Sequence, residues 1–275
     1  MSYSNSSDTN LRSQAWLDAY PSQINDSFYI KPEGAGSLER ILAFGLDLEA
    51  IQPLIDDYNQ NKKLSTSSNL VLVYGLDQGK NLNTPPTFSI SVQYDDGRGN
   101  VSDAYALHPL SNSTLSSYLS QHIAQKDGNE KPLDSDLQRL TEEVIPIYFE
   151  HLLCYAWRSC ESSALVDQVE AMDEGVRKRI KRSIYDNQVC SLLAKQYAEN
   201  DNNVATVLLM GLHPVIPDGK RIFPFGPVLQ SYIPGTPQDN LDDLQSNSNS
   251  NEDIEEGSNV HATNYELSKP CPPSC

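Results

Sequence analysis

The run from Asn69 to Val101 constrains the fold of this chain more than any other stretch. Residues 69–75 are almost wholly apolar and rich in β-branched and aromatic side chains, which is typical of a central strand. Residues 87–94 alternate between apolar and polar side chains, which is the pattern of a strand with one buried face and one face toward water. Asp96-Gly97 is a strong turn signal directly after them. The pattern therefore predicts a pair of strands within a sheet.

Helical patterns surround this strand pair in the sequence. An apolar stripe with helical spacing runs through residues 48–58, and a similar stripe runs through 111–126. The second half of the chain shows two longer helical patterns, at 147–160 and 176–199, while residues 204–212 indicate another buried strand. We therefore expect an α+β fold, in which a small, mainly antiparallel sheet is covered by helices and is followed by a helical C-terminal half and a disordered acidic tail.

Changes in composition divide the chain into four predicted parts. The end of the chain is rich in Ser, Asn, Asp and Glu, and it lacks the apolar content that offsets the entropy of ordering. The sequence leaves open whether the two main parts share one core. The predicted parts are a disordered segment at 1–9, an α+β region at 10–126, a mainly helical region at 133–235 that ends in a proline-rich strap, and a disordered acidic tail at 236–275.

The net charge argues against two classes of partner. The 275 residues carry 20 Lys and Arg against 37 Asp and Glu, which gives a formal net charge of −17. Nucleic acids and anionic membranes attract proteins with a positive field, so we expect neither as a partner. The first ten residues lack the basic and apolar regions of a secretory signal, and no stretch approaches the roughly 20 apolar residues that span a bilayer. The predicted location is therefore the cytoplasm, with which the odd count of five Cys agrees.

We find no motif that predicts a cofactor, a metal or a catalytic residue. The segments 34–36 and 97–99 are each only Gly-Xaa-Gly, without the strand-to-helix context of a nucleotide site. His151 and Cys154 share one face of the predicted helix, but no second ligand pair accompanies them. We interpret these two residues as buried and structural.

The segment at 214–237 combines six prolines and three glycines with several aromatic residues. Such a run cannot form a regular helix, and we interpret it as an ordered, irregular segment laid over the body. A rigid proline-rich segment loses little entropy on binding, so its aromatic residues are candidate partner contacts. The alternative is a strap whose aromatic residues pack on the core. The candidate residues are Phe223, Phe225 and Tyr232.

Five of the twenty basic residues fall within six positions, and we refer to them as the basic cluster. The predicted helix at 176–199 would place them around Ile180, which would face inward. Three interpretations stay open: a docking strip for a phosphate-bearing or acidic partner, a docking strip for the chain's own acidic tail, and a solvated helix face. The basic cluster consists of Arg177, Lys178, Arg179, Lys181 and Arg182.

The chain ends with two cysteines, Cys271 and Cys275, that are separated by prolines. Two thiols on a stiff bend suit four functional interpretations: a soft-metal pair, a redox pair, a modified peptide end or a tether. A metal site needs about four ligands, and His261 is the only nearby candidate for a third. The alternative is an exposed, reduced tail without chemistry.

Four short stretches resemble a type of protein that is already known. They are a helix end at 54–59, a strand at 71–77, the alternating strand that runs into Gly97, and the C-terminal residues 270–275. Together they resemble uncharacterised small bacterial proteins that combine a helix–strand–strand unit with a Cys-Pro-Pro-Xaa-Cys end. The resemblance covers about a third of the chain, and it implies a type of fold with no activity to transfer.

These observations predict a non-catalytic interaction or accessory protein in the cytoplasm, with a protein as its partner and no cofactor. One alternative is an enzyme of unrecognised type that uses His108 or His213 with a carboxylate, because each histidine follows a possible strand. A second alternative is a carrier that presents its Cys-containing C-terminal peptide for modification or metal binding.

Overall fold

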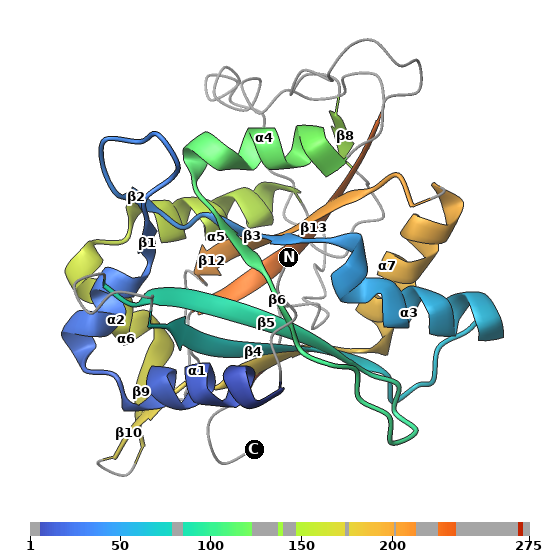
Figure 1. Ribbon diagram of the computed structural model, residues 1–275, viewed down its shortest axis with the longest axis horizontal. Helices are drawn as coiled ribbons and strands as arrows, with labels where there is room; N and C mark the ends of the chain where they lie inside the picture. The colour runs from blue at the N-terminus through green and yellow to red at the C-terminus, as the bar shows by residue number, and fades with distance from the viewer. Residues whose placement is uncertain are drawn as a thin grey trace, which may run out of the picture.

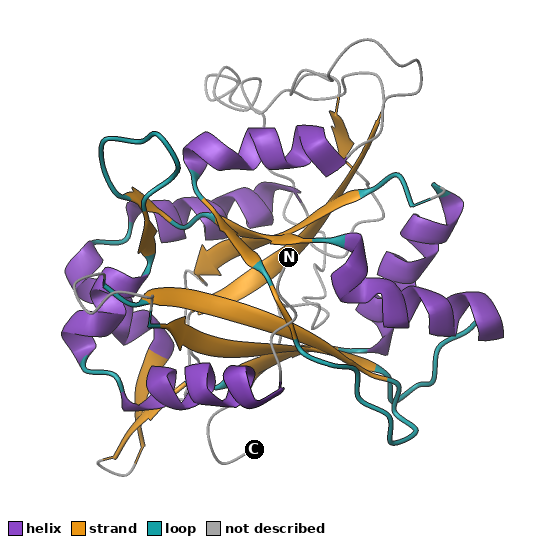
Figure 2. Cartoon of the chain, viewed as in Figure 1, coloured by secondary structure: helices purple, strands orange, loops and turns teal. Residues whose placement is uncertain are grey.

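The computed structural model describes residues 6–78, 85–122, 137–139, 147–173, 176–200, 202–212, 225–234 and 269–271. Within these ranges the chain contains two five-stranded antiparallel sheets (Figure 1). Helices lie around the sheets on several sides (Figure 2). The predicted α+β class is confirmed, with two large sheets in place of the single small sheet that the sequence indicated.

The first sheet contains the predicted strand pair at its centre. Its strands are β4 (Asn69–Asp77), β5 (Thr87–Asp95), β6 (Tyr105–Ala106), β11 (Arg182–Tyr185) and β14 (Lys269–Cys271), in the order β14-β11-β4-β5-β6. β4 and β5 align along their whole length, from Asn69 opposite Asp95 to Asp77 opposite Thr87. The apolar positions of the alternating pattern are buried in β5, as predicted; they are Phe88, Ile90, Val92 and Tyr94.

The second sheet is built around the buried strand predicted at 204–212. Its strands are β3 (Ala43–Leu46), β7 (His108–Leu110), β8 (Leu137–Arg139), β12 (Ala205–Leu212) and β13 (Phe225–Pro234), in the order β7-β3-β12-β13-β8. Every residue of β12 is buried, and β13 pairs with it from Ala205 opposite Tyr232 to Leu212 opposite Phe225.

Two short antiparallel ribbons lie beside the sheets. One pairs β1 (Tyr29–Ile30) with β2 (Glu39–Arg40), and the other pairs β9 (Glu170–Asp173) with β10 (Val176–Arg179). The second ribbon is followed in the sequence by β11. The chain, which formed β4, β5 and β6 earlier, therefore returns to the first sheet after this ribbon.

The helices occupy the ends and outer faces of the sheets. They are α1 (Ser6–Asp18), α2 (Pro21–Ser27), α3 (Leu48–Asn61), α4 (Asn112–His122), α5 (Ile147–Ser159), α6 (Leu165–Val169) and α7 (Asn187–Glu199), with a 3-10 helix at Ser162–Ala164. α3 and α7 pack against one another at one end of the sheets, on the right of Figure 1. The helices predicted at 48–58, 111–126 and 147–160 are confirmed as α3, α4 and α5.

One aromatic core joins the two main regions that the sequence divided. Phe88 of the first sheet lies 4.8 Å from Phe28 and 5.0 Å from Trp16, measured between ring centroids. Trp157 of α5 lies 5.6 Å from Phe225 of the second sheet, and all five side chains are fully or almost fully buried. Residues from 10–126 and from 133–235 therefore share a single core cluster.

A second, smaller core covers the other face of the second sheet. Leu209 of β12 and Val228 of β13 belong to it, together with Tyr118 and Leu119 of α4 and Leu153 of α5. Because both faces of β12 are covered, this strand is apolar throughout rather than alternating.

The prediction of a helical C-terminal half is wrong between residues 170 and 185. Part of the predicted helix at 176–199 forms β10 and β11, and only Asn187–Glu199 is helical. Val176, Ile180 and Ile184 recur every four residues, and a spacing of four fits one face of a strand as well as a helix. Tertiary pairing of β11 with β4 decided between the two.

The prediction of an irregular segment at 214–237 is also wrong for residues 225–234, which form the regular strand β13. Pro227 and Pro234 lie near its two ends, and residues 228–233 between them contain no proline. A strand accepts proline at its ends and at positions that give no ladder hydrogen bond, so the prolines bound this strand rather than exclude it.

Candidate functional site

Arg179 of the basic cluster is buried in an ion pair. Its Nε donates a hydrogen bond of 2.7 Å to Glu170 Oε1, and its Nη1 donates to the carbonyl oxygen of Trp16. Its Nη2 donates to the carbonyl oxygen of Ala19 at 2.9 Å, just beyond α1. The guanidinium also lies 5.3 Å from the centre of the Trp16 ring. Arg179 therefore holds α1 against the β9–β10 ribbon and does not face a partner.

The rest of the basic cluster lies on strands rather than on a helix. Lys178, Lys181 and Arg182 are partly exposed, and Arg177 stands beside them in β10. The Nε of Arg182 is buried and has no hydrogen-bond acceptor among the residues that the structure describes. The predicted solvated helix face is wrong, because these residues lie on β10, on β11 and on the short link between the two strands.

The C-terminal strand β14 adds to the outer edge of β11. Arg182 stands opposite Cys271, Ser183 opposite Pro270, and Ile184 opposite Lys269. Lys269–Cys271, within the tail predicted at 236–275, form this strand. The acidic stretch of the tail and Cys275 lie outside the described residues, so the docking of the acidic stretch on the basic cluster stays a prediction.

The register of β14 suits its proline. The backbone N–H of Tyr74 donates to the carbonyl oxygen of Lys181 at 3.1 Å, so Lys181 and Ser183 direct their backbone groups toward β4. Arg182 and Ile184 then direct theirs toward β14, because successive residues of a strand point to opposite neighbours. Pro270, opposite Ser183, stands where no backbone donor is needed.

β11 is also well anchored on its inner side. Ser183 Oγ lies 2.5 Å from the hydroxyl of Tyr74, and the hydroxyl of Tyr185 donates to the carbonyl oxygen of Pro227 at 2.7 Å. Burial raises the pKa of Tyr185 well above its usual value, so this hydroxyl remains a donor. These two hydrogen bonds fix the inner side of β11 to β4 and β13.

Of the aromatic residues predicted as partner contacts, Phe225 does not lie on a binding surface. Phe225 is only 1% exposed and lies in the main core. Tyr232 is partly buried and packs against the second core. Phe223 lies outside the described residues. Packing on the core, the alternative interpretation, is confirmed for Phe225.

The structure brings one of the predicted histidines near a carboxylate. His108 lies at the start of β7, and its Nε2 is 3.7 Å from Oδ2 of Asp47. The hydroxyl of Tyr118 donates to Oδ1 of the same carboxylate at 2.9 Å. Pairing of β3 with β7 sets this geometry, because it places Gly45 opposite His108. His213 lies outside the described residues.

Burial and charge keep the tyrosines around Asp47 protonated. Burial is the main cause that raises the pKa of Tyr118 far above its usual value, and the Asp47 charge raises it further. Burial raises the pKa of Tyr197 to about 12. The Tyr197 hydroxyl donates to Thr206 Oγ1 at 3.0 Å, which lies 2.9 Å from Ser231 Oγ. These tyrosines act as hydrogen-bond donors rather than as bases.

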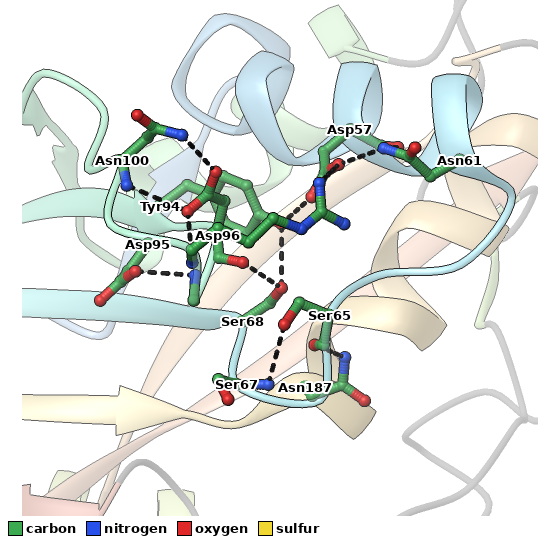
Figure 3. A network of polar contacts seen from close by, with 12 residues as sticks. Asp57, Asn61, Ser65, Ser67, Ser68, Tyr94, Asp95, Asp96, Asn100 and Asn187 are labelled. Atoms are coloured by element: carbon green, nitrogen blue, oxygen red, sulfur yellow. Dashed lines mark hydrogen bonds and ion pairs between the residues drawn. The ribbon is translucent and has the colours of Figure 1, made fainter.

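A third polar group joins the turn after β5 to helix α3 (Figure 3). The Tyr94 hydroxyl donates to Asp57 Oδ2 at 2.7 Å, and Arg98 Nη1 lies 3.5 Å from Asp57 Oδ1. Asp96 accepts from the backbone N–H of Arg98 at 2.7 Å and from the side chain of Asn100, also at 2.7 Å. These bonds, that of Asn100 first, lower the pKa of Asp96. The network closes the predicted turn on itself, so we interpret it as structural.

Gly97 explains why this turn requires its predicted glycine. Its φ is +66°, and a Cβ at this position would lie 2.5 Å from the carbonyl carbon of Ser67. The loop before β4 is in turn held by Asn187 of α7, whose side chain donates to the carbonyl oxygen of Ser65.

The described part of the chain shows neither a cluster of metal ligands nor a helix that could span a membrane. No three His, Cys, Asp or Glu side chains within the described ranges gather as possible metal ligands. None of the helices in those ranges has the length and apolar character needed to cross a membrane.

Comparisons with protein-family models, with curated proteins and with solved structures found no match to this chain. The resemblance to small bacterial proteins therefore stays a prediction.

Proposed function

We propose that this chain is a non-catalytic interaction protein that binds an extended peptide of a protein partner along the outer edge of β11. The observation that carries the proposal is β14, in which Lys269–Cys271 already occupies this edge as an added strand. Strand addition is a common mode of peptide recognition, in which main-chain hydrogen bonds provide affinity. The cytoplasm, predicted from the sequence, is the proposed location.

The resident strand is short enough to be replaced. Three residues pair with β11, and each main-chain hydrogen bond contributes only about 0.5–1.5 kcal/mol net. The strand gains from its covalent link to the body, because a tethered peptide has an effective concentration on the order of millimolar. A partner peptide that pairs with all four residues of β11 would compete with it.

Hydrogen exchange at the edge tests this proposal. The backbone N–H groups of Arg182 and Ile184 face β14, so we expect them to exchange slowly in the full chain. Removal of residues 269–275 should speed their exchange. Addition of a synthetic peptide of residues 266–275 at millimolar concentration should slow it again. Ser183, which faces β4, is the internal control and should exchange slowly throughout. Equal exchange of Arg182 and Ile184 with and without residues 269–275 would exclude strand addition.

A second candidate function rests on a different observation, the 3.7 Å separation of His108 Nε2 and Asp47 Oδ2. In this enzyme proposal His108 accepts a proton from a water molecule that attacks an ester carbonyl, and Asp47 orients the imidazole. The acyl C–O bond of the ester then breaks, the acid and the alkoxide or phenolate leave, and the proton on His108 passes to the leaving oxygen or to solvent. Hydrolysis of p-nitrophenyl acetate should then exceed the buffer rate and fall with His108→Gln. A rate that His108→Gln leaves unchanged would remove this candidate.

The carrier alternative concerns the C-terminal cysteines. Cys271 lies in β14, opposite Arg182. We expect intact mass spectrometry of the natively expressed chain to show the modification or metal if the end is a carried group. Free thiols at Cys271 and Cys275 would leave strand addition as the role of this segment.

A further inference from the structure

The resident strand leaves a chemical requirement of β11 unmet. Arg182 Nε is buried without an acceptor among the described residues, and a buried donor that lacks an acceptor costs free energy. The residue opposite Arg182 in the added strand is Cys271, and a thiol is only a weak acceptor. A better occupant would place a strong acceptor at this position.

The local charge favours an anionic acceptor. Two partly exposed lysines precede Arg182 in the sequence, Lys181 directly and Lys178 at the end of the β9–β10 ribbon that leads into β11. In the resident strand, Lys269 stands two positions before Cys271, in register with Ile184. Like charges repel across neighbouring strands, whereas opposite charges that face one another stabilise the pair. The occupant that complements this edge is therefore acidic where the resident strand has a thiol.

We infer that the β11 edge selects a partner's extended peptide that carries Asp or Glu at the position opposite Arg182. The inference rests on the proposed strand addition and specifies the chemistry of the partner. The carboxylate accepts from the Arg182 guanidinium, and charge-assisted hydrogen bonds of this kind are stronger than neutral ones. Main-chain pairing with Arg182 and Ile184 supplies the remaining contacts, as it does for β14.

The chain's own strand offers a direct test in the full-length protein. Cys271→Glu places a carboxylate opposite Arg182, and Cys271→Gln provides a similar side chain without the charge. We expect the exchange of the Arg182 and Ile184 amides to be roughly threefold to tenfold slower in Cys271→Glu than in Cys271→Gln, as a charged hydrogen bond implies. About 0.5 M NaCl should reduce the difference, because salt screens partly exposed pairs.

Two control variants separate a specific pair from general attraction. Ser268→Glu adds the same charge to the same segment but three positions before Cys271, so it should slow exchange less. Arg182→Gln in the Cys271→Glu background should abolish the slower amide exchange that Cys271→Glu produces. A far-UV circular dichroism spectrum and a thermal transition would verify that this variant folds. If Arg182→Gln does not fold, the comparison of Ser268→Glu with Cys271→Glu decides the question alone.

Peptides in trans extend the test to an external partner. The probes are synthetic peptides of residues 266–275 with Glu or Gln in place of Cys271, labelled for fluorescence anisotropy and added to the full chain. Tighter binding of the Glu peptide is the expected result. Equal affinity of the two peptides, together with equal exchange in the two full-length variants, would overturn the acidic preference. Strand addition itself would still stand if residues 269–275 protect the edge, so the two failures are distinguishable.

Discussion

Arg179 and Glu170 form an ion pair that is enclosed beneath the end of helix α1. Arg179 is 7% exposed. Its Nη1 and Nη2 also donate hydrogen bonds to the backbone carbonyl oxygens of Trp16 in α1 and of Ala19 just after it. The pair stands across the β9–β10 ribbon, where Arg179 is directly opposite Glu170. Arg179, which the sequence groups with the surface residues of the basic cluster, is thus buried in the interior.

Substitution of Arg179 should unfold this corner of the protein. Arg179→Gln leaves Glu170 buried beside a neutral amide, and loss of one partner of a buried pair costs about 3–5 kcal/mol. Arg12→Gln is the matched control, because the 3.7 Å pair of Arg12 with Asp77 is partly exposed and such pairs contribute at most about 1 kcal/mol. Urea unfolding measures both free energies. Similar losses in the two variants would contradict the enclosed pair.

Truncation of Phe225 should cost stability rather than a partner. Phe225→Ala removes a ring that contacts Trp157 and Tyr74, each at a centroid distance of 5.6 Å, and we expect a loss of about 3–5 kcal/mol. Tyr155→Ala is the control, because Tyr155 is 68% exposed and its removal should change stability by about 0.5 kcal/mol or less. If Phe225→Ala is about as stable as the parent chain, Phe225 is not part of the core and its predicted role as a partner contact is favoured.

A methyl group at Gly45 should disturb the packing of Tyr118, which contacts Asp47. A Cβ there would lie 2.4 Å from the Tyr118 ring, whose hydroxyl donates to Asp47. Gly45→Ala should therefore cost about 1–3 kcal/mol through overpacking. Gly36→Ala, where a Cβ meets nothing within 4 Å, should leave the thermal transition almost unchanged. Equal transitions in the two variants would show that Tyr118 moves aside freely.

Alkaline pH should destabilise the fold through buried groups that must stay neutral. Burial raises the pKa of the Cys190 thiol from 9.0 to about 12, and it raises the pKa of Tyr197 to about 12. Both pKa values are higher in the folded than in the unfolded chain, so the stability is complete below about pH 9 and is lost as pH rises toward 12. Each such group contributes about 1.4 kcal/mol per pH unit within its own window.

Denaturant unfolding between pH 8 and pH 11 measures this loss. Cys190→Ala should make the decline between pH 9 and pH 10 less steep, because it removes the contribution of this buried thiol, while the Cys160 thiol, whose pKa burial also raises, still contributes. In the parent chain, alkylation of Cys190 at pH 9 should follow the unfolding rate, because the folded thiol remains protonated. A decline that is the same with and without Cys190 would refute its role.

Local sequence patterns predicted the elements that depend on neighbours along the chain. The alternation of residues 87–94, the apolar stripe of 48–58 and the Asp96-Gly97 turn all carry their signal within a few residues. Their partners in the fold are close in sequence as well, since β4 pairs with β5. These elements form as expected because periodicity and turn chemistry act over short distances.

Patterns that suit two structures were resolved only by distant contacts. The spacing of Val176, Ile180 and Ile184 fits helix and strand alike, and pairing with β4 selected the strand. The prolines in and near residues 225–234 predicted an irregular segment, but these residues form a strand that pairs with β12. The approach of His108 to Asp47 likewise needed β3 and β7 to pair, so the sequence could name the histidine but not its carboxylate.

The sequence by itself determined the α+β class, the central strand pair, the buried strand predicted at 204–212 and the helices that flank them, because each of these is encoded by the periodic order of nearby side chains. Only the tertiary structure decided that Arg179 is internal, that Phe225 is core, and that Lys269–Cys271 lies on the edge of β11. The physical reason is that these facts depend on pairing between residues such as Tyr74 and Ser183, which are 109 positions apart. No local pattern specifies such a register; it follows from which strands bury their apolar faces together.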